Sequence, residues 1–231
     1  MDIQSQMTFD TLTDLLTRKS FLLALTHFLT AAKSKKAEAP LSVALLDIDS
    51  FMEINGTYGH VTGDQVLSGV ADAIREVGFE RMHAARYGGD EFALLMPGLE
   101  REQAFLRLEE IRAGLSQRVF QRAEGAGIEG ISISGGLATF PIDGRTENEL
   151  MRKASQALYR AKTGTKGRIR LAYEERMVPK TAHFTQTQLE RLGKLAEEHQ
   201  VNEADLLREA VDDLLTKYEV NDIESGTLGA G

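Results

Sequence analysis

Apolar residues in the first 172 positions fall into two patterns, one typical of helices and one typical of strands. Within 100–119 they recur at helical spacing, at Ala104, Leu108, Ile111 and Leu115. On this basis the chain predicts helices near 18–32, 63–77, 100–119 and 147–162. Apolar runs predict strands at 41–49, 82–85, 92–96 and 168–172, and an alternating strand at 131–138. Helices over one sheet, joined by hairpins and crossovers, favour a ferredoxin-like α+β core.

Two glycines and two acids, Gly88, Gly89, Asp90 and Glu91, separate the second and third of these strands. The arrangement predicts a β-hairpin with a tight glycine turn and carboxylates at its tip. Glycines let a backbone approach a bulky ligand closely. Adjacent carboxylates are costly unless they are solvated or bind a cation, and divalent metals that also bind phosphates are the obvious candidates. A solvated turn that happens to be acidic is the alternative.

The strand at 41–49 also ends in two acids, Asp47 and Asp49. Acids at the end of a buried strand meet water while the strand body fills the core. Together with the hairpin acids they predict a site for one or two magnesium ions. The alternative is that Asp47 or Asp49 merely caps the next helix.

Five short motifs in this order resemble the GGDEF family of diguanylate cyclases. They are Asp47-Ile48-Asp49-Ser50-Phe51, Asn55, Tyr58-Gly59-His60, Gly63-Asp64 and Gly88-Gly89-Asp90-Glu91-Phe92. The resemblance covers about residues 8–172, from an opening motif at 10–18 to a final helix at 157–162. It implies an adenylyl-cyclase-like domain with helices around a mainly antiparallel sheet. It also implies a cytoplasmic enzyme that condenses two GTP molecules into cyclic di-GMP and pyrophosphate.

The same resemblance implies roles for individual residues. Asp47, the backbone of Ile48 and Asp90 would hold two Mg²⁺ (or Mn²⁺) ions against the triphosphate. Asn55 and Asp64 would read the guanine edge. Glu91 would lie beside the ribose 3′-hydroxyl, and Lys162 would neutralise phosphate charge. Further substrate contacts are implied for a group of surrounding residues: Phe51, His60, Arg86, Gly88, Gly89 and Lys166.

The chain also departs from the family's pattern. Met52 replaces a Lys, Gly56 replaces an Asp, Ser155 replaces an Asp, and Lys166 replaces an Arg that binds phosphate in a bidentate manner. The product-inhibition motif Arg-x-x-Asp is missing, because Phe79 and Met82 occupy its charged positions. We therefore expect a cyclase without feedback inhibition through this site. A catalytically silent nucleotide-binding module and a changed base preference are the alternatives.

Composition constrains the setting of this activity. The 231 residues include no cysteine, and the net charge is −8, which gives no general attraction to nucleic acid or anionic lipid. No signal peptide and no apolar run long enough to span a membrane are present, so we expect no membrane partner. No receiver or sensory domain precedes Met7, and we expect a C-terminal dimer to take its place and to give a largely constitutive enzyme.

We predict three parts: a cyclase domain at 1–175, a small unit at 178–220 and a flexible tail at 221–231. The small unit begins with a short strand at 180–184, and Thr185 caps a helix at 186–199. A second helix starts at Asn202, and 201–210 resembles the second helix of ribbon-helix-helix proteins. In that family, two chains pair to form one β-α-α dimer.

That resemblance leaves two functions open for the small unit. One is DNA binding through Lys180, Thr181 and His183, which would make the chain a catalytically weak GTP- or dinucleotide-binding regulator that binds DNA. The other is formation of a homodimer alone. From Val178 onward, five Lys and Arg stand against eleven Asp and Glu. Because DNA affinity rests on several basic phosphate contacts, this charge favours the homodimer.

Overall fold

A computed structural model describes residues 7–34, 39–79, 81–120, 127–172, 182 and 184–199, with residues 203, 206, 207, 210 and 211. The chain divides into two compact units, Met1–Glu175 and Arg176–Gly231, which are described separately. None of the helices in the described part combines the length and the apolar composition that crossing a bilayer requires.

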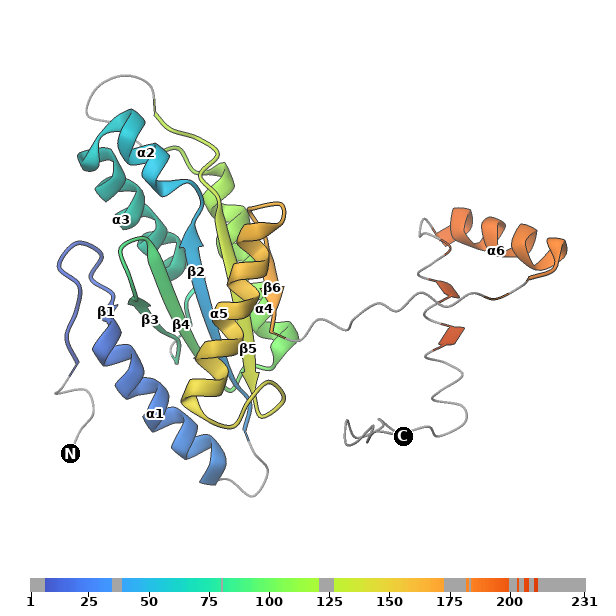
Figure 1. The fold of residues 1–231 in the computed structure, drawn as a ribbon, viewed down its shortest axis with the longest axis horizontal. Helices are drawn as coiled ribbons and strands as arrows, with labels where there is room; N and C mark the ends of the chain where they lie inside the picture. The colour runs from blue at the N-terminus through green and yellow to red at the C-terminus, as the bar shows by residue number, and fades with distance from the viewer. Residues whose placement is uncertain are drawn as a thin grey trace, which may run out of the picture. The chain divides into compact units, whose positions relative to one another are not determined.

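In its described residues, the first unit is a six-stranded sheet with five helices (Figure 1). Its strands are β1 (Leu16–Thr17), β2 (Leu41–Ile48), β3 (His83–Arg86), β4 (Glu91–Pro97), β5 (Ile133–Phe140) and β6 (Ile169–Leu171). Its helices are α1 (Arg18–Ser34), α2 (Phe51–Tyr58), α3 (His60–Val77), α4 (Arg101–Gln117) and α5 (Glu147–Thr163). The strand order is β1-β3-β4-β2-β5-β6, with parallel pairs only at the two edges. The expected α+β fold with a mainly antiparallel sheet is confirmed.

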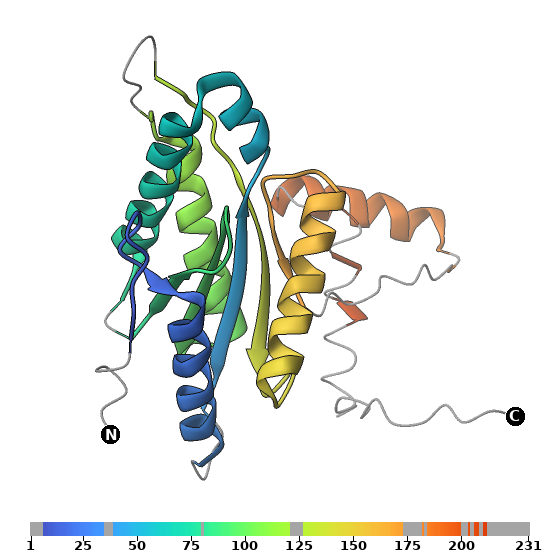
Figure 2. The same cartoon turned by 60° about the vertical axis from the view of Figure 1, so that its left-hand side comes forward.

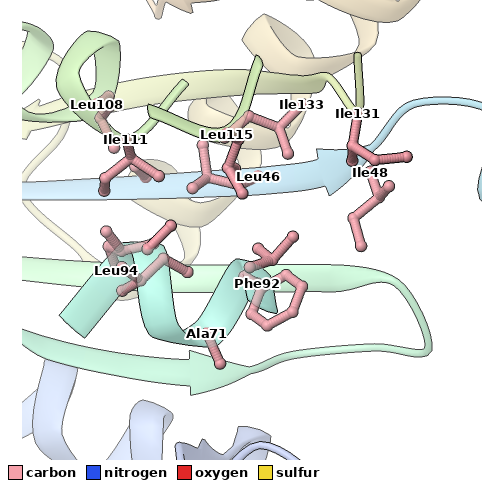
Figure 3. Close-up of a cluster of buried hydrophobic side chains, with 14 of the residues drawn as sticks. Leu46, Ile48, Ala71, Phe92, Leu94, Leu108, Ile111, Leu115, Ile131 and Ile133 are labelled. Carbon is pink, nitrogen blue, oxygen red and sulfur yellow. The ribbon is translucent and has the colours of Figure 1, made fainter. Parts of the chain in front are cut away.

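Helices cover both faces of this sheet (Figures 1 and 2). One face packs against α3 and α4, and a single buried cluster on this face includes Phe92 of the sheet, Ala71 of α3 and Leu115 of α4 (Figure 3). The other face packs against α1 and α5. Because β2 lies at the centre of the sheet, its first six residues are all buried. Asp47 is the first residue of this strand with partial access to water, and Ile48, its last residue, is buried again.

Three sequence expectations about this unit were wrong in detail. The strand expected at 131–138 is β5, which starts at Ile133 and is buried at all eight positions instead of alternating, because helices cover both faces. The short β1 and the helix α2 were not predicted. Neither Asp47 nor Asp49 caps α2: its N-cap is Ser50, with a φ of 55° and no side-chain capping bond.

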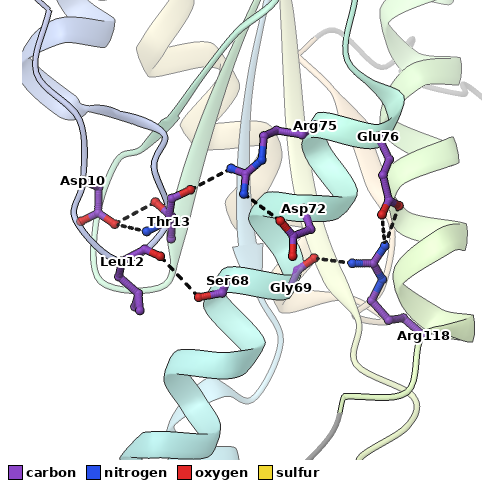
Figure 4. Close-up of polar contacts among 9 residues, drawn as sticks. All are labelled: Asp10, Leu12, Thr13, Ser68, Gly69, Asp72, Arg75, Glu76 and Arg118. Carbon is purple, nitrogen blue, oxygen red and sulfur yellow. Dashed lines mark hydrogen bonds and ion pairs between the residues drawn. The ribbon is translucent and has the colours of Figure 1, made fainter.

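The N-terminal segment is tied to α3 by polar contacts (Figure 4). The carbonyl oxygen of Thr13 accepts a hydrogen bond from Nη1 of Arg75 at 2.8 Å, and that of Leu12 accepts one from Oγ of Ser68 at 3.4 Å. Asp10 in turn accepts bonds from the backbone and hydroxyl of Thr13 at 2.9 and 2.7 Å. These bonds fix Asp10 beside the hairpin of β3 and β4, which it reaches through Arg86.

The second unit contains α6 (Gln186–His199), with the predicted bounds. The predicted cap is confirmed, because Oγ1 of Thr185 accepts a bond from the backbone N–H of Gln188 at 3.3 Å. Residues 203, 206, 207, 210 and 211 are also helical. The candidate DNA-facing residues Lys180, Thr181 and His183 lie outside the described residues, as does the tail expected at 221–231.

Candidate functional site

The end of β2 meets the tip of the hairpin at one edge of the sheet. The antiparallel register places Asp47 opposite Glu91. One residue further, the backbone N–H of Ile48 donates to the carbonyl oxygen of Asp90 at 3.3 Å. Sheet pairing therefore brings the three predicted metal ligands, Asp47, Ile48 and Asp90, to one place although the 41 residues 49–89 lie between Ile48 and Asp90.

The turn between β3 and β4 is wider than the predicted tight glycine turn. The backbone N–H groups of Tyr87 and Gly88 both donate to the carbonyl oxygen of Glu91, at 2.8 and 3.1 Å. Neither Gly88 nor Gly89 has a positive φ. A Cβ at Gly88 would meet Oε2 of Glu91 at 2.9 Å, whereas one at Gly89 would meet nothing within 4 Å. Gly88 therefore makes room for the Glu91 side chain, and Gly89 leaves open space at the tip.

Arg86 braces this turn from within. Its Nε and Nη2 donate to the carbonyl oxygen of Gly89 at 3.1 and 2.8 Å, and its Nη1 lies 3.4 Å from Asp10. Burial would raise the pKa of Asp10, but bonds from Thr13 and the charge of Arg86 hold that pKa below its usual value. The substrate contact expected for Arg86 stays a prediction, and its described bonds shape the hairpin.

Lys162, near the end of α5, directs its ammonium group at the same edge. Nζ donates to Oδ1 of Asp47, and it lies 3.2 Å from the carbonyl oxygen of Ile48. Two of the three predicted metal ligands thus already converge on a cation. This donor set, a carboxylate and a backbone carbonyl, is the oxygen chemistry that Mg²⁺ and Mn²⁺ prefer, so the residues fit the implied metal.

The electrostatics of this edge also fit a cation. Burial raises the pKa of Asp47, Lys162 opposes that effect, and the charges of Asp90 and Glu91 add to the rise. A bound cation would relieve this repulsion between carboxylates. The described residues contain no group of three or more His, Cys, Asp or Glu placed to hold a metal. Mg²⁺ in proteins is commonly held by one or two carboxylates together with water and substrate phosphates.

Asn55 on α2 provides a second binding element. Its Oδ1 is buried, and among the described residues it has no hydrogen-bond partner. The amide packs on Gly63 of α3, where an added Cβ would collide with Oδ1 and lie 3.3 Å from Cζ of Phe51. An unpaired buried acceptor costs free energy that a ligand donor would recover. The three residues therefore form a small polar seat with an aromatic wall.

Within the described residues, three other predicted site residues, Asp64, His60 and Lys166, are not bonded to the group formed by Asp47, Ile48, Asp90 and Lys162. Asp64 and His60 are exposed on α3, and Asp64 lines an open groove with Val61 and Arg118. No hydrogen bond or ion pair between described residues links either one to Asp47 or Asp90. Lys166 is exposed, and its Nζ lies 3.3 Å from Oγ of Ser50.

Sequence reasoning missed the role of Asp49, which is only 7% exposed. Its carboxylate accepts bonds from the hydroxyls of Ser132 and Ser134, at 2.7 and 2.8 Å, and from the backbone N–H of Gly167 at 2.9 Å. The signal was available in the sequence: two serines two residues apart place both hydroxyls on one face of an extended segment.

Comparison with known proteins agrees with this geometry. Residues 7–168 match the family described as diguanylate cyclase, GGDEF domain, and residues 178–219 match the ribbon-helix-helix domain. Diguanylate cyclase A of Treponema denticola is 32% identical over 173 residues, 73% of this chain and 46% of that protein. Diguanylate cyclase DosC of Escherichia coli is 35% identical over 141 residues, 61% of this chain and 30% of that protein. The chain thus spans less than half the length of these curated relatives.

Solved structures show the same fold. The GGDEF domain of DgcB from Caulobacter crescentus, in complex with c-di-GMP, is 36% identical with a TM-score of 0.66, over 72% of this chain and 94% of that one. The GGDEF domain of TpbB (YfiN) from Pseudomonas aeruginosa is 34% identical with a TM-score of 0.68, over 72% and 95%. With its paired strand ends, its acidic hairpin and these matches, the chain belongs to the diguanylate cyclase GGDEF-domain family.

Proposed function

We propose that this protein is a diguanylate cyclase that condenses two GTP molecules into cyclic di-GMP with release of pyrophosphate. The observation that carries the proposal is the convergence of Asp47, the carbonyl of Ile48 and Asp90 at one sheet edge, with Lys162 directed at it. The names of the relatives support the same activity.

In this proposal Asp47, Ile48 and Asp90 hold two Mg²⁺ or Mn²⁺ ions. Such ions, when bound, lower the pKa of an attacking hydroxyl and stabilise charge on a leaving phosphate. Lys162 and Lys166 add positive charge beside the triphosphate, and Lys162 leaves Asp47 when a divalent ion takes that carboxylate. Glu91, opposite Asp47, accepts a hydrogen bond from the ribose 3′-hydroxyl and orients its oxygen toward the α-phosphorus of the second GTP.

Asn55 and Asp64 select the base. The unpaired Oδ1 of Asn55 is an acceptor for a guanine N–H group, and the Asp64 carboxylate is an acceptor for another. Both residues sit at the junction of α2 and α3, and Phe51 forms the apolar wall. His60 and the open tip at Gly89 complete the surface that the nucleotide approaches.

The test is incubation with GTP and Mg²⁺, followed by mass analysis of the product. We expect cyclic di-GMP from the native chain and none from Asp90→Ala. Asp72→Ala, which removes an exposed acid of α3 that pairs with Arg75, is the control and should keep the activity. Absence of product from the native chain, or equal product from Asp90→Ala, would refute the proposal.

The proposed enzyme lacks feedback inhibition through the Arg-x-x-Asp site. Phe79 and Met82, at the two charged positions of that motif, pack against the core formed with α3 and α4. Apolar side chains supply neither a guanidinium nor a carboxylate to a dinucleotide. The inactive Asp90→Asn variant should show no tight cyclic di-GMP binding. Tight binding that disappears on replacing Arg81 would contradict this.

We also propose that the C-terminal unit forms a homodimer and brings two GTP sites together. Leu189 and Leu195 of α6 are 44% and 42% exposed, and Val211 is 54% exposed, so the unit has apolar surface to bury against a second copy. When two chains are joined in a dimer, each GTP site meets the other at a high effective concentration. Leu195→Asp should give a monomer in light scattering and a specific activity that falls on dilution. A Leu195→Asp dimer with full activity would refute this arrangement.

A further inference from the structure

The buried carboxylate of Asp49 collects more donors than any role as a helix cap requires. It accepts the hydroxyls of Ser132 and Ser134 and the backbone N–H of Gly167. Nζ of Lys162 lies 3.4 Å from its Oδ1. A buried charge is tolerated when it is paired and hydrogen-bonded in this way. Asp49 is therefore a fixed anionic point directly behind the site edge, two residues beyond Asp47.

The turn that follows α5 is anchored on this carboxylate. Gly167 has a φ of 74°, and its N–H is shared between Oδ2 of Asp49 and Oγ of Ser134, at 2.9 and 3.2 Å. Lys166 immediately precedes it and reaches Oγ of Ser50, the residue after Asp49. The position of the Lys166 ammonium thus depends on the bond between Gly167 and Asp49.

Lys162 is shared between two carboxylates that differ in burial. Asp47 lies at the water-accessible edge, whereas Asp49 is nearly covered. A divalent ion at Asp47 and the Ile48 carbonyl would take both of those acceptors from Lys162. The two oxygens of Asp49 are already bound to Ser132 and Ser134, and its Oδ1 lies 3.4 Å from Nζ of Lys162. Asp49 therefore remains as the anion that keeps the ammonium in place.

We propose that Asp49 is a positioning residue that holds Lys162 and Lys166 toward the triphosphate during the reaction. The inference rests on the proposed function, because it assigns Asp49 to the phosphate side of that same site. It predicts that Asp49 governs affinity for the phosphates and leaves recognition of the base, by Asn55 on the separate helix α2, unchanged.

The experiment compares Asp49→Asn with Asp143→Asn in the full-length chain. Asp143 is a matched control, since it is 1% exposed and accepts bonds from Arg101 at 2.8 Å and from the backbone of Thr139 at 2.7 Å, outside the site. Calorimetry measures binding of a non-hydrolysable GTP analogue with Mg²⁺, and of guanosine alone. Loss of a supporting residue of this kind typically costs about 10-fold or more.

We expect Asp49→Asn to bind the analogue about 10-fold more weakly while its guanosine affinity is kept, and Asp143→Asn to change neither affinity. Amide hydrogen exchange at 164–168 should also accelerate in Asp49→Asn alone. Equal losses for analogue and guanosine, or native affinity in Asp49→Asn, would overturn the inference. Both readouts measure binding or exchange, so they stand apart from the proposed function, which fails if the native chain binds the analogue yet makes no cyclic dinucleotide from GTP.

Discussion

Replacing Gly63 with alanine should expel the Asn55 amide from its seat and weaken guanine recognition. The new Cβ would lie 3.0 Å from Cγ of Asn55 and closer still to Oδ1, well inside van der Waals contact. The amide must therefore move by about 1 Å or more, since carbon contacts are comfortable at about 3.5–4.0 Å. Phe51, 3.3 Å from the new Cβ, limits the directions in which it can move.

The size of the effect follows from the bonds that Asn55 would lose. One or two neutral hydrogen bonds to the base, at about 0.5–1.5 kcal/mol each, correspond to about 2- to 150-fold weaker GTP binding. The free energy of unfolding should change less than the free energy of GTP binding. Overpacking costs about 1–3 kcal/mol, and the higher helix propensity of alanine inside α3 returns about 1 kcal/mol.

The assay is calorimetric binding of non-hydrolysable GTP and ATP analogues, with urea unfolding as a check on the fold. Gly56→Ala is the matched control, because it lies in α2 next to Asn55 and its Cβ would meet nothing within 4 Å. That variant should keep its preference for the GTP analogue and gain up to about 1 kcal/mol of stability. A Gly63→Ala protein that still prefers the GTP analogue to the native extent would refute the reasoning.

Three further predictions concern the fold. Burial, followed by the nearby charge of His27, holds the pKa of His83 below its ordinary value of 6.5. The unfolded chain therefore binds more protons, and the free energy of unfolding should fall as pH drops below about 6.5. Urea midpoints between pH 7.5 and 5.5 should show a decrease that His83→Gln reduces, and an equal decrease in that variant would refute the prediction. Gly136→Ala places a Cβ against the backbone of α5, 3.0 Å from the carbonyl carbon of Ala157. It should lower the free energy of unfolding in urea by about 3 kcal/mol. An unaltered urea midpoint would show that α5 can shift freely. Thr146→Ala removes half of the capping box of α5 and should lower the free energy of unfolding by about 1 kcal/mol in the same measurement. An unchanged free energy of unfolding would mean that Glu149 caps the helix alone.

The sequence predicted most of the architecture because its signals are local. The run from Leu41 to Asp49 indicated a buried strand ending in acids, and β2 ends at Ile48. The helical spacing around Leu108 and Ile111 indicated α4 within one residue at its start. The two-residue strand β1 escaped prediction, since it is too short to show a pattern and pairs with β3, which is distant in the sequence.

The identities of the candidate ligands also came from local motifs, whereas their arrangement did not. Gly88 and Gly89 suggested a tight turn, yet Gly88 provides clearance for the Glu91 side chain and Gly89 leaves an open tip. Arg86 was expected to contact the substrate, and it braces the turn through Gly89. Hydrogen bonds of this kind depend on which side chains the folded backbone brings within about 3 Å, and the spacing of residues along the chain does not encode that.

The sequence by itself therefore determined the α+β class, the acidic strand end and hairpin, and a separate C-terminal helical unit, because hydrophobic periodicity and turn residues act over short distances. Only the tertiary structure decided that Lys162 faces Asp47, that the Asn55 amide packs on Gly63, and that Asp49 anchors the turn at Gly167. These contacts join residues up to 118 positions apart. They arise because the sheet and α5 are packed into one core, which fixes distant side chains relative to one another.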